Sequence, residues 1–410
     1  MSSRERRCLA AVITVWAILL SLFVFTARPW YPDAPLRNDF IAFWTGASLV
    51  HQGNGADLYD MEAQAAFQRE LRARLELGAS GAREQRLIPY HNPPALALLM
   101  APMATLPFNW GYLLWSILQA VAFLVAVAIP LRGSPGGRGW ALLLLTFPAV
   151  ADTLVWGQMV GFLLLIYSLA LVALGANRPV LGGALLGLLW LKPQYGMIFP
   201  LVLLIKRRWR ELAGMVATGS ILVIFSFVAA GPLALHRYLE LLQRIGGYYP
   251  PAESLVKEYA MVNWRSALAH LLPGLPETTG SFLVLLLGGV TVLISLLVWR
   301  GAWEPSSPRF AGQALALTLA TLIAAPHSHF HGTAMLLAPL ALVLGRVELG
   351  TGLSRKWRLM FAGGYLLALV VWPFTDLAWL VAPFFMFAVL LLIRENQISK
   401  ALQSTSPSLS

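Results

Sequence analysis

The fold is decided by stretches such as residues 109–131, NWGYLLWSILQAVAFLVAVAIPL, which contain no Asp, Glu, Lys or Arg. A helix needs about 20 apolar residues to cross the hydrocarbon core of a bilayer. The composition extends this pattern over the chain: of its 410 residues 58% are hydrophobic and 12% charged, and the mean hydropathy is +0.68. Soluble domains carry roughly a quarter charged residues. The sequence therefore predicts an all-α, polytopic membrane protein.

Apolar runs recur along the chain and predict a bundle of about twelve transmembrane helices. They lie at about 9–27, 109–131, 139–153, 158–175, 179–192, 194–205, 211–231, 281–299, 309–325, 331–345, 357–374 and 377–393. The first run follows Arg4, Arg6 and Arg7 without a cleavage pattern after it, which predicts a retained helix. The bundle is expected to form one domain, residues 1–393, followed by a cytoplasmic tail, 394–410.

Two of these runs are too short for a straight span and meet at Pro193. They predict a broken helix, which is tolerated only where protein or a water-filled cavity satisfies the freed backbone groups.

The positions of the basic residues predict the topology. With a cytoplasmic N-terminus, every short basic loop falls on the cytoplasmic side, as the positive-inside bias requires. The +11 net charge is therefore a topology signal rather than a sign of nucleic-acid binding. This arrangement requires that residues 93–107, interrupted by Pro102 and Pro107, do not cross; otherwise one of the short runs beside Pro193 does not. Both termini are then inside, and two long loops, 28–92 and 232–279, are outside.

Unusual polar groups converge at the outer ends of the predicted helices. Residues 39–49 predict an amphipathic helix that lies on the membrane in the first outer loop, with Asn38 or Asp39 as its N-cap. The polar groups are Asp39, His91, Asp152, Trp156-Gly157-Gln158, Lys192-Pro193-Gln194 and the alternating His327, His329 and His331. Ionisable groups at membrane level are costly and tend to mark function.

Simpler structural explanations exist for each group. Asp39 could cap its helix, Lys192 could extend its ammonium to the interface, and Gln158 could hydrogen-bond between helices. The three alternating histidines suggest zinc, but no Cys or nearby carboxylate completes a ligand set, so no metal is expected.

Several functional classes lack their motifs. The chain has no phosphate-binding loop, no dinucleotide fingerprint and no Gly-x-Ser-x-Gly elbow. A transporter would show two related halves with matching broken helices, whereas here one interrupted pair occurs. The pattern favours an enzyme, and a lipid-linked sugar flippase or transporter is the alternative.

The order of the motifs resembles that of the GT-C membrane glycosyltransferases and, more closely, glycosyltransferase family 87, over about residues 35–390. The matching motifs are Asp39-Phe40, Tyr90-His91-Asn92-Pro93-Pro94, Trp156-Gly157-Gln158, Leu191-Lys192-Pro193-Gln194 and the basic stretch from Lys206. Their order and spacing, rather than any single motif, carry the resemblance. His91-Asn92 departs from it, because relatives more often have the Tyr directly before Pro-Pro, so we assign His91 no family role.

The resemblance implies a hexosyltransferase of the bacterial plasma membrane that needs no cofactor. It would move a hexose, expected to be mannose, with inversion from a polyprenyl-phosphate donor to an extracytoplasmic glycan or glycolipid acceptor. Arabinofuranose and glucose donors stay open. Asp39 is the expected general base. Positive charge and hydrogen-bond donors around the leaving phosphate are expected from Lys192, Gln194, Arg265, His327, His329 and His331.

Sugar recognition is expected from residues near the second outer loop and from Gln158. The candidates are Gln158, Tyr248, Tyr249, Asn263 and Trp264. Aromatic faces pack well on the apolar side of a pyranose. The alternative is that the tyrosines and Trp264 belong to an interfacial aromatic belt.

Overall fold

The computed structural model describes residues 14, 36, 38–75, 87–134, 137–246, 260–345, 355–372 and 374–405. Within these ranges the chain is helical, and the only strand-like pairing is a single bridge between Met261 and His329. The all-α prediction is therefore confirmed at the level of fold class. The first apolar run, 9–27, lies outside the described residues apart from Thr14.

Four of the described helical segments are long and apolar enough to cross a membrane, or five if a bent pair counts as one span. The segments are Phe108–Leu131 (α5), Trp209–Arg244 in α11 (Trp209–Gly246), Glu277–Trp299, which contains α13 (Glu277–Leu296), and Asp376–Arg394, which enters α17 (Val381–Thr405). The bent pair is α6 (Gly137–Leu145) with α7 (Pro148–Val155). The expected count of about twelve spans is thus not confirmed.

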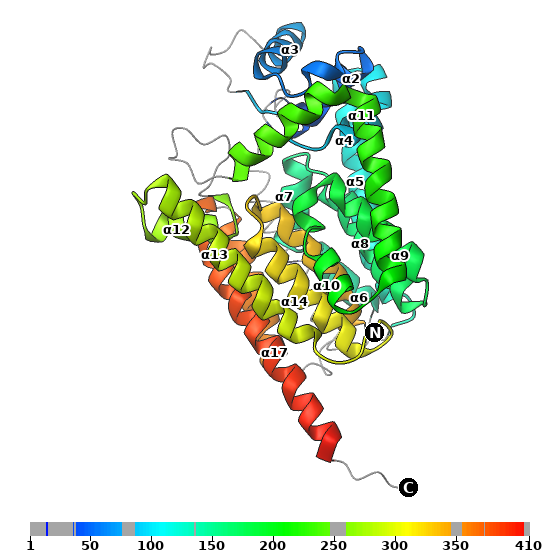
Figure 1. Ribbon diagram of the computed structural model, residues 1–410, viewed down its shortest axis with the longest axis vertical. Helices are drawn as coiled ribbons and strands as arrows, with labels where there is room; N and C mark the ends of the chain where they lie inside the picture. The colour runs from blue at the N-terminus through cyan, green and yellow to red at the C-terminus, as the bar shows by residue number, and fades with distance from the viewer. Residues whose placement is uncertain are drawn as a thin grey trace.

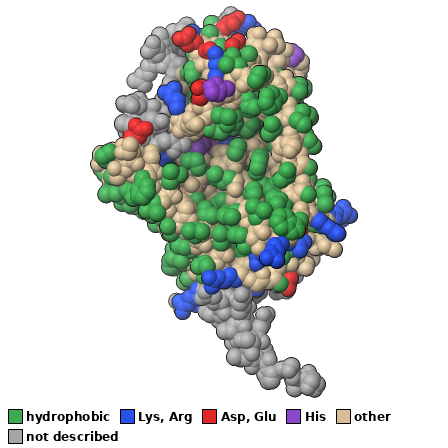
Figure 2. Space-filling model, viewed as in Figure 1, with side chains coloured by type: hydrophobic (Ala, Val, Ile, Leu, Met, Phe, Trp, Pro, Cys, Tyr) green, Lys and Arg blue, Asp and Glu red, His purple; other side chains and the backbone are tan. Residues whose placement is uncertain are grey.

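The other apolar runs form shorter helices. They are α8 (Val160–Gly175), α9 (Pro179–Leu188), α10 (Phe199–Ile205), α14 (Pro308–Ala324), α15 (Leu337–Leu344) and α16 (Arg355–Val371). Large apolar side chains nevertheless point outward along the flanks: Val228 on α11 and Leu285 on α13 are each 73% exposed. Figure 2 shows hydrophobic side chains covering much of the visible flank. A surface of this kind suits lipid rather than water, so the chain is a multi-pass membrane protein.

The interruption predicted at Pro193 is present. After α9, two short 3-10 turns, Leu189–Leu191 (η4) and Pro193–Tyr195 (η5), flank Lys192, whose backbone is not helical (φ −138°, ψ 85°). Extended backbone is the conformation favoured before a proline. The break holds Lys192 between two helical segments, and its side chain is buried.

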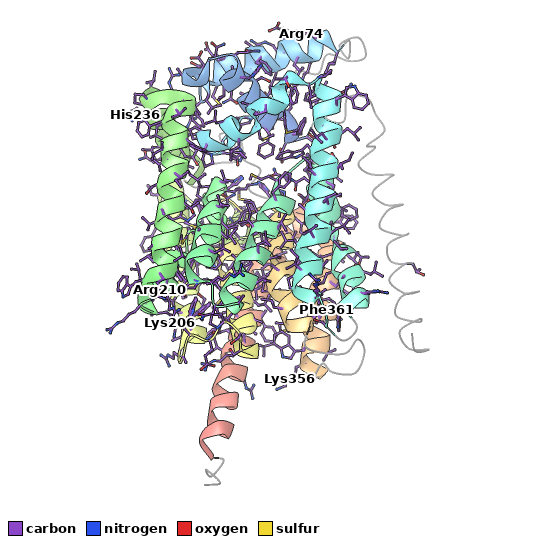
Figure 3. The ribbon with its side chains drawn as sticks, turned by 90° about the vertical axis from the view of Figure 1, so that its right-hand side faces the viewer. Arg74, Lys206, Arg210, His236, Lys356 and Phe361 are labelled. Carbon is purple, nitrogen blue, oxygen red and sulfur yellow. The ribbon has the colours of Figure 1, made fainter. Side chains whose placement is uncertain are left out.

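One end of the molecule carries a cap of short elements. It comprises α2 (Phe40–His51), α3 (Met61–Arg74), α4 (Pro94–Met100) and η3 (Ala101–Thr105), which gather with the second half of α11 at the upper end of Figure 1. Gly231, with φ 73°, kinks α11 just before Pro232 and turns that half across the bundle. Lys206, Arg210 and Lys356 lie at the opposite end (Figure 3).

The prediction that residues 39–49 form an amphipathic helix lying on the membrane is wrong. The helix forms, but every residue from Phe40 to Leu49 is buried, because α4 and η3 cover it and aromatic rings of α5 pack on Phe40. Residues 94–105, at roughly 1.5 Å per residue, span about 18 Å, which is too short to cross.

Candidate active site

Asp39 lies directly before α2, with its side chain partly exposed. Its backbone N–H donates to the carbonyl of Trp156 (3.0 Å). The side chain of the neighbouring Asn38 accepts the N–H of Phe40 (3.0 Å), whereas the Asp39 carboxylate makes no capping hydrogen bond. Capping therefore falls to Asn38, which leaves the Asp39 carboxylate available for other partners.

Gln158 joins Asp39 to Lys192. Its Nε2 donates to Asp39 Oδ2 (2.6 Å), and its Oε1 accepts from Lys192 Nζ (2.6 Å). An ammonium can only donate and a carboxylate can only accept, so the orientation of the amide is fixed by its partners. Gln158 and Lys192 are 5% and 3% exposed. The structure thus brings together three predicted site residues from distant parts of the chain.

Gly157 occupies a position in this junction that only glycine can fill. It has φ 62°, in the left-handed region that L-residues with a Cβ avoid. A Cβ here would lie 2.7 Å from Phe40 Cβ, and the Gly157 carbonyl accepts the indole N–H of Trp115 (2.9 Å). Only glycine lets residues 156–158 approach the start of α2 this closely.

Four histidine side chains lie together beside this junction. Ring centroids are 4.7 Å apart for His327 and His329, 5.8 Å for His329 and His331, and 5.2 Å for His327 and His91. His91 was given no role from the sequence, and only the fold brings it to this cluster. His331 Nδ1 is 3.8 Å from Asp152 Oδ2. In the described ranges, no group of three or more His, Cys, Asp or Glu residues is arranged to hold a metal.

Two of these histidines lie in non-helical segments outside the spans, and their protonation is set by burial. Burial lowers the pKa of His91, and the nearby Lys192 charge lowers it further, against a hydrogen bond to the Pro89 carbonyl. Burial lowers the pKa of His329 to about 4, although Asp39 opposes the shift. Both imidazoles are therefore neutral near pH 7, so they offer hydrogen bonds but no charge.

Residues 261–263 are hydrogen-bonded to the segment that carries the three alternating histidines. Val262 N–H donates to the Ser328 carbonyl (2.8 Å) beside the bridge between Met261 and His329. Asn263 caps α12 (Trp264–Leu271) by accepting the Ser266 N–H (3.2 Å), and its Nδ2 donates to the Ala325 carbonyl (2.8 Å).

The remaining predicted site residues differ in their burial and in their contacts. Arg265 is 1% exposed on α12, and Gln194 is half-buried two residues after Lys192. Trp264 is half-buried, and its indole donates to Thr291 Oγ1 (2.8 Å). Tyr248 and Tyr249 lie outside the described residues. Asn263 caps α12 and bonds the Ala325 carbonyl, so its side chain has a structural role. Tyr195, which the sequence did not single out, packs beside Lys192.

Comparison with known proteins identifies the family. The model of glycosyltransferase family 87 matches residues 90–326, more than half of the chain. This range contains Gln158, Lys192 and Arg265, whereas Asp39 and His331 lie outside it. No solved structure matches the chain.

Curated relatives are mycobacterial glycosyltransferases. The polyprenol-phosphate-mannose-dependent alpha-(1-2)-phosphatidylinositol pentamannoside mannosyltransferase of Mycolicibacterium smegmatis is 28% identical over 296 residues, 67% of this chain and 69% of the relative. Its Mycobacterium tuberculosis namesake is 27% identical, over 60% of this chain and 56% of the relative. The alpha-(1->3)-arabinofuranosyltransferase of M. tuberculosis is 35% identical over 154 residues, 35% of this chain and 34% of the relative. The chain belongs to glycosyltransferase family 87 and is a membrane glycosyltransferase.

Proposed function

We propose that the protein transfers mannose from a polyprenyl-phosphate donor to a glycolipid or glycan, with Asp39 as general base. The observation that carries this proposal is the linked triplet in which Lys192 bonds Gln158 and Gln158 bonds Asp39. It sets a carboxylate and a buried ammonium at opposite ends of one amide. A base for the acceptor and a cation for the leaving phosphate are the two charges that this reaction needs.

Asp39 is suited to take the acceptor proton. Gln158 holds Oδ2, and the carboxylate keeps further acceptor capacity for an incoming hydroxyl. As that hydroxyl attacks the anomeric carbon, its proton passes to Asp39 and the bond between the anomeric carbon and the phosphate oxygen breaks. The phosphate leaves with the electron pair. One displacement inverts the anomeric configuration.

Lys192 is suited to receive the phosphate. Its ammonium has three N–H donors, of which Gln158 uses one. A polyprenyl phosphate leaves as a stable anion, so a second carboxylic acid of the kind glycosidases use is unnecessary. Arg265, Gln194, His327, His329 and His331 are proposed to add hydrogen bonds and packing around the phosphate.

The site is proposed to face the outside of the plasma membrane. The cap that holds α2 lies opposite the end with Lys206, Arg210 and Lys356, and clustered basic residues favour the cytoplasm. Loops 28–92 and 232–279 are then outside, the single domain is 1–393, and the tail 394–410 is inside. The acceptor would approach from the outer face, and Tyr249 and Trp264 are proposed to contact its sugar, with Gln158 and Asn263 shaping the site.

One experiment separates this function from its alternatives. The full chain, reconstituted in vesicles, is given polyprenyl-phosphate mannose with labelled sugar together with a phosphatidylinositol mannoside acceptor, and the lipids are analysed by mass spectrometry. A new mannosyl glycolipid supports the proposal. Movement of label between leaflets without a new glycoside would instead identify a flippase. A product formed only from polyprenyl-phosphate arabinofuranose would assign the sugar named for the arabinofuranosyltransferase relative.

A further inference from the structure

Three buried polar atoms on η5 and on the segment 327–329 have no hydrogen-bond partner within the described part of the chain: Tyr195 Oη, Ser328 Oγ and His327 Nδ1. Tyr195 and Ser328 are 4% and 1% exposed. Buried hydroxyls in folded proteins nearly always have a partner, which is protein, water or a bound ligand. The Tyr195 ring lies beside the buried Lys192 ammonium, so this part of the site has donors that a ligand with several acceptor atoms would satisfy.

Tyr195 is held in place by the same break that presents Lys192. Its N–H donates to the Lys192 carbonyl (3.0 Å), and Lys192 Nζ lies 5.9 Å from the centre of its ring. The hydroxyl end reaches the backbone of Gly332, where a Cβ would come within 2.5 Å of Tyr195 Oη. The glycine thus makes room for a buried hydroxyl at this point of the chain.

The hydroxyls of Tyr195 and Ser328 share one chemistry with the Lys192 ammonium. Both hydroxyls and the ammonium donate hydrogen bonds, and the ammonium also carries positive charge. Their common complement is a group with several acceptor oxygens, and negative charge on that group would also attract the ammonium. Phosphate meets both requirements, and hydrogen bonds to a charged partner are the stronger class.

Resting on the proposed function, we propose that the hydroxyls of Tyr195 and Ser328 donate hydrogen bonds to the phosphate of the polyprenyl-phosphate donor, alongside Lys192. The phosphate stays bound here after sugar transfer, since the same oxygens belong to the polyprenyl-phosphate product. Tyr195 and Ser328 would then contribute to donor and product affinity without taking part in proton transfer.

The test measures binding rather than turnover. Polyprenyl phosphate and the uncharged polyprenol of the same chain length are titrated into the full chain in nanodiscs, with wild type and Tyr195→Phe. Loss of one hydrogen bond to an anion is expected to weaken polyprenyl-phosphate binding about tenfold and leave polyprenol binding unchanged. Ser328→Ala is expected to act in the same direction and serves as the second variant if Tyr195→Phe does not fold.

Tyr167→Phe is the matched control. Tyr167 is also a buried tyrosine, but its hydroxyl bonds Thr318 Oγ1 (3.0 Å), so its loss is expected to leave both affinities unchanged. Unchanged phosphate affinity in Tyr195→Phe and Ser328→Ala would overturn the inference and assign water as the partner. Equal weakening of polyprenyl phosphate and polyprenol would overturn it as a packing effect. Wild type that neither binds polyprenyl phosphate nor forms a glycoside would instead refute the proposed function.

Discussion

Gln158 Nε2 donates to Asp39 Oδ2 over 2.6 Å across a separation of 119 residues. Because the other end of the same amide accepts from Lys192, this bond ties the orientation of the carboxylate to a buried cation. A base that is held in one orientation loses less freedom when the acceptor arrives. The relationship couples the two charged residues structurally.

Asp39→Asn is expected to lower kcat at least roughly a hundredfold, the low end for a positioned general base, while donor binding is retained. The amide keeps the size of the side chain but cannot take up the acceptor proton. Asp60→Asn is the control: Asp60 also lies in the segment 28–92, but it caps α3 by accepting the N–H groups of Glu62 and Ala63, a role that Asn fills equally well. Near-normal turnover by Asp39→Asn in a purified assay would exclude the assignment.

Replacement of Lys192 is expected to weaken donor binding in proportion to the lost charge. Lys192→Ala removes the ammonium and should raise the donor KM more than Lys192→Arg, which keeps a cation. Lys206→Ala provides the comparison, because Lys206 bonds the Gly301 carbonyl at the basic end and should not affect the donor. Equal, unchanged donor affinity in both Lys192 variants would mean that Lys192 serves only to hold Gln158.

Gln158→Met is expected to reduce kcat roughly tenfold or more, because it removes two hydrogen bonds to charged groups. Single-turnover rates at saturating donor would separate this loss from weaker binding. Gln313→Met is the matched variant, since Gln313 is likewise buried but bonds the Val298 carbonyl (3.0 Å) and no charged group. If both variants lose thermal stability and neither loses turnover, Gln158 has only a structural role.

Gly157→Ala is expected to lower both thermal stability and turnover. The new Cβ would meet Phe40 Cβ at 2.7 Å and displace the start of α2, which carries Asp39. Gly133→Ala isolates the backbone contribution: Gly133 has φ 75° but nothing lies within 4 Å of its Cβ position, so only a conformational penalty of about 1 kcal/mol is expected. Indistinguishable turnover in the two variants would show that close approach at Gly157 is not needed.

The proposed orientation predicts that Arg74→Cys reacts with a membrane-impermeant maleimide in intact cells and that Arg210→Cys does not. Both side chains are exposed and lie at opposite ends of the molecule. Cys8 is the only natural cysteine, so a Cys8→Ser background leaves one reactive site in each variant. The reverse labelling pattern would place the site in the cytoplasm.

The sequence by itself determined the class of protein and the parts of its site. Long uncharged runs predict helices, because a helix satisfies its own backbone hydrogen bonds in lipid. Pro193 predicts the break beside Lys192. These features are local, so a linear pattern contains them. The burial of α2 depends on residues far away in the sequence. An apolar stretch has the same composition whether one side or all sides of its helix are covered. Only the packing of α4, η3 and α5 shows that Phe40–Leu49 face protein.

Tertiary structure alone decided which polar groups meet. From the sequence, Gln158 and Lys192 were each explained separately. Nothing in their spacing shows that the Gln158 amide joins Lys192 to Asp39. The same holds for His91, whose ring packs on His327, and for Tyr195, whose hydroxyl is distinguished only by lacking a partner. Hydrogen bonds depend on distance and direction between atoms, and these are set when helices pack and not by position along the chain.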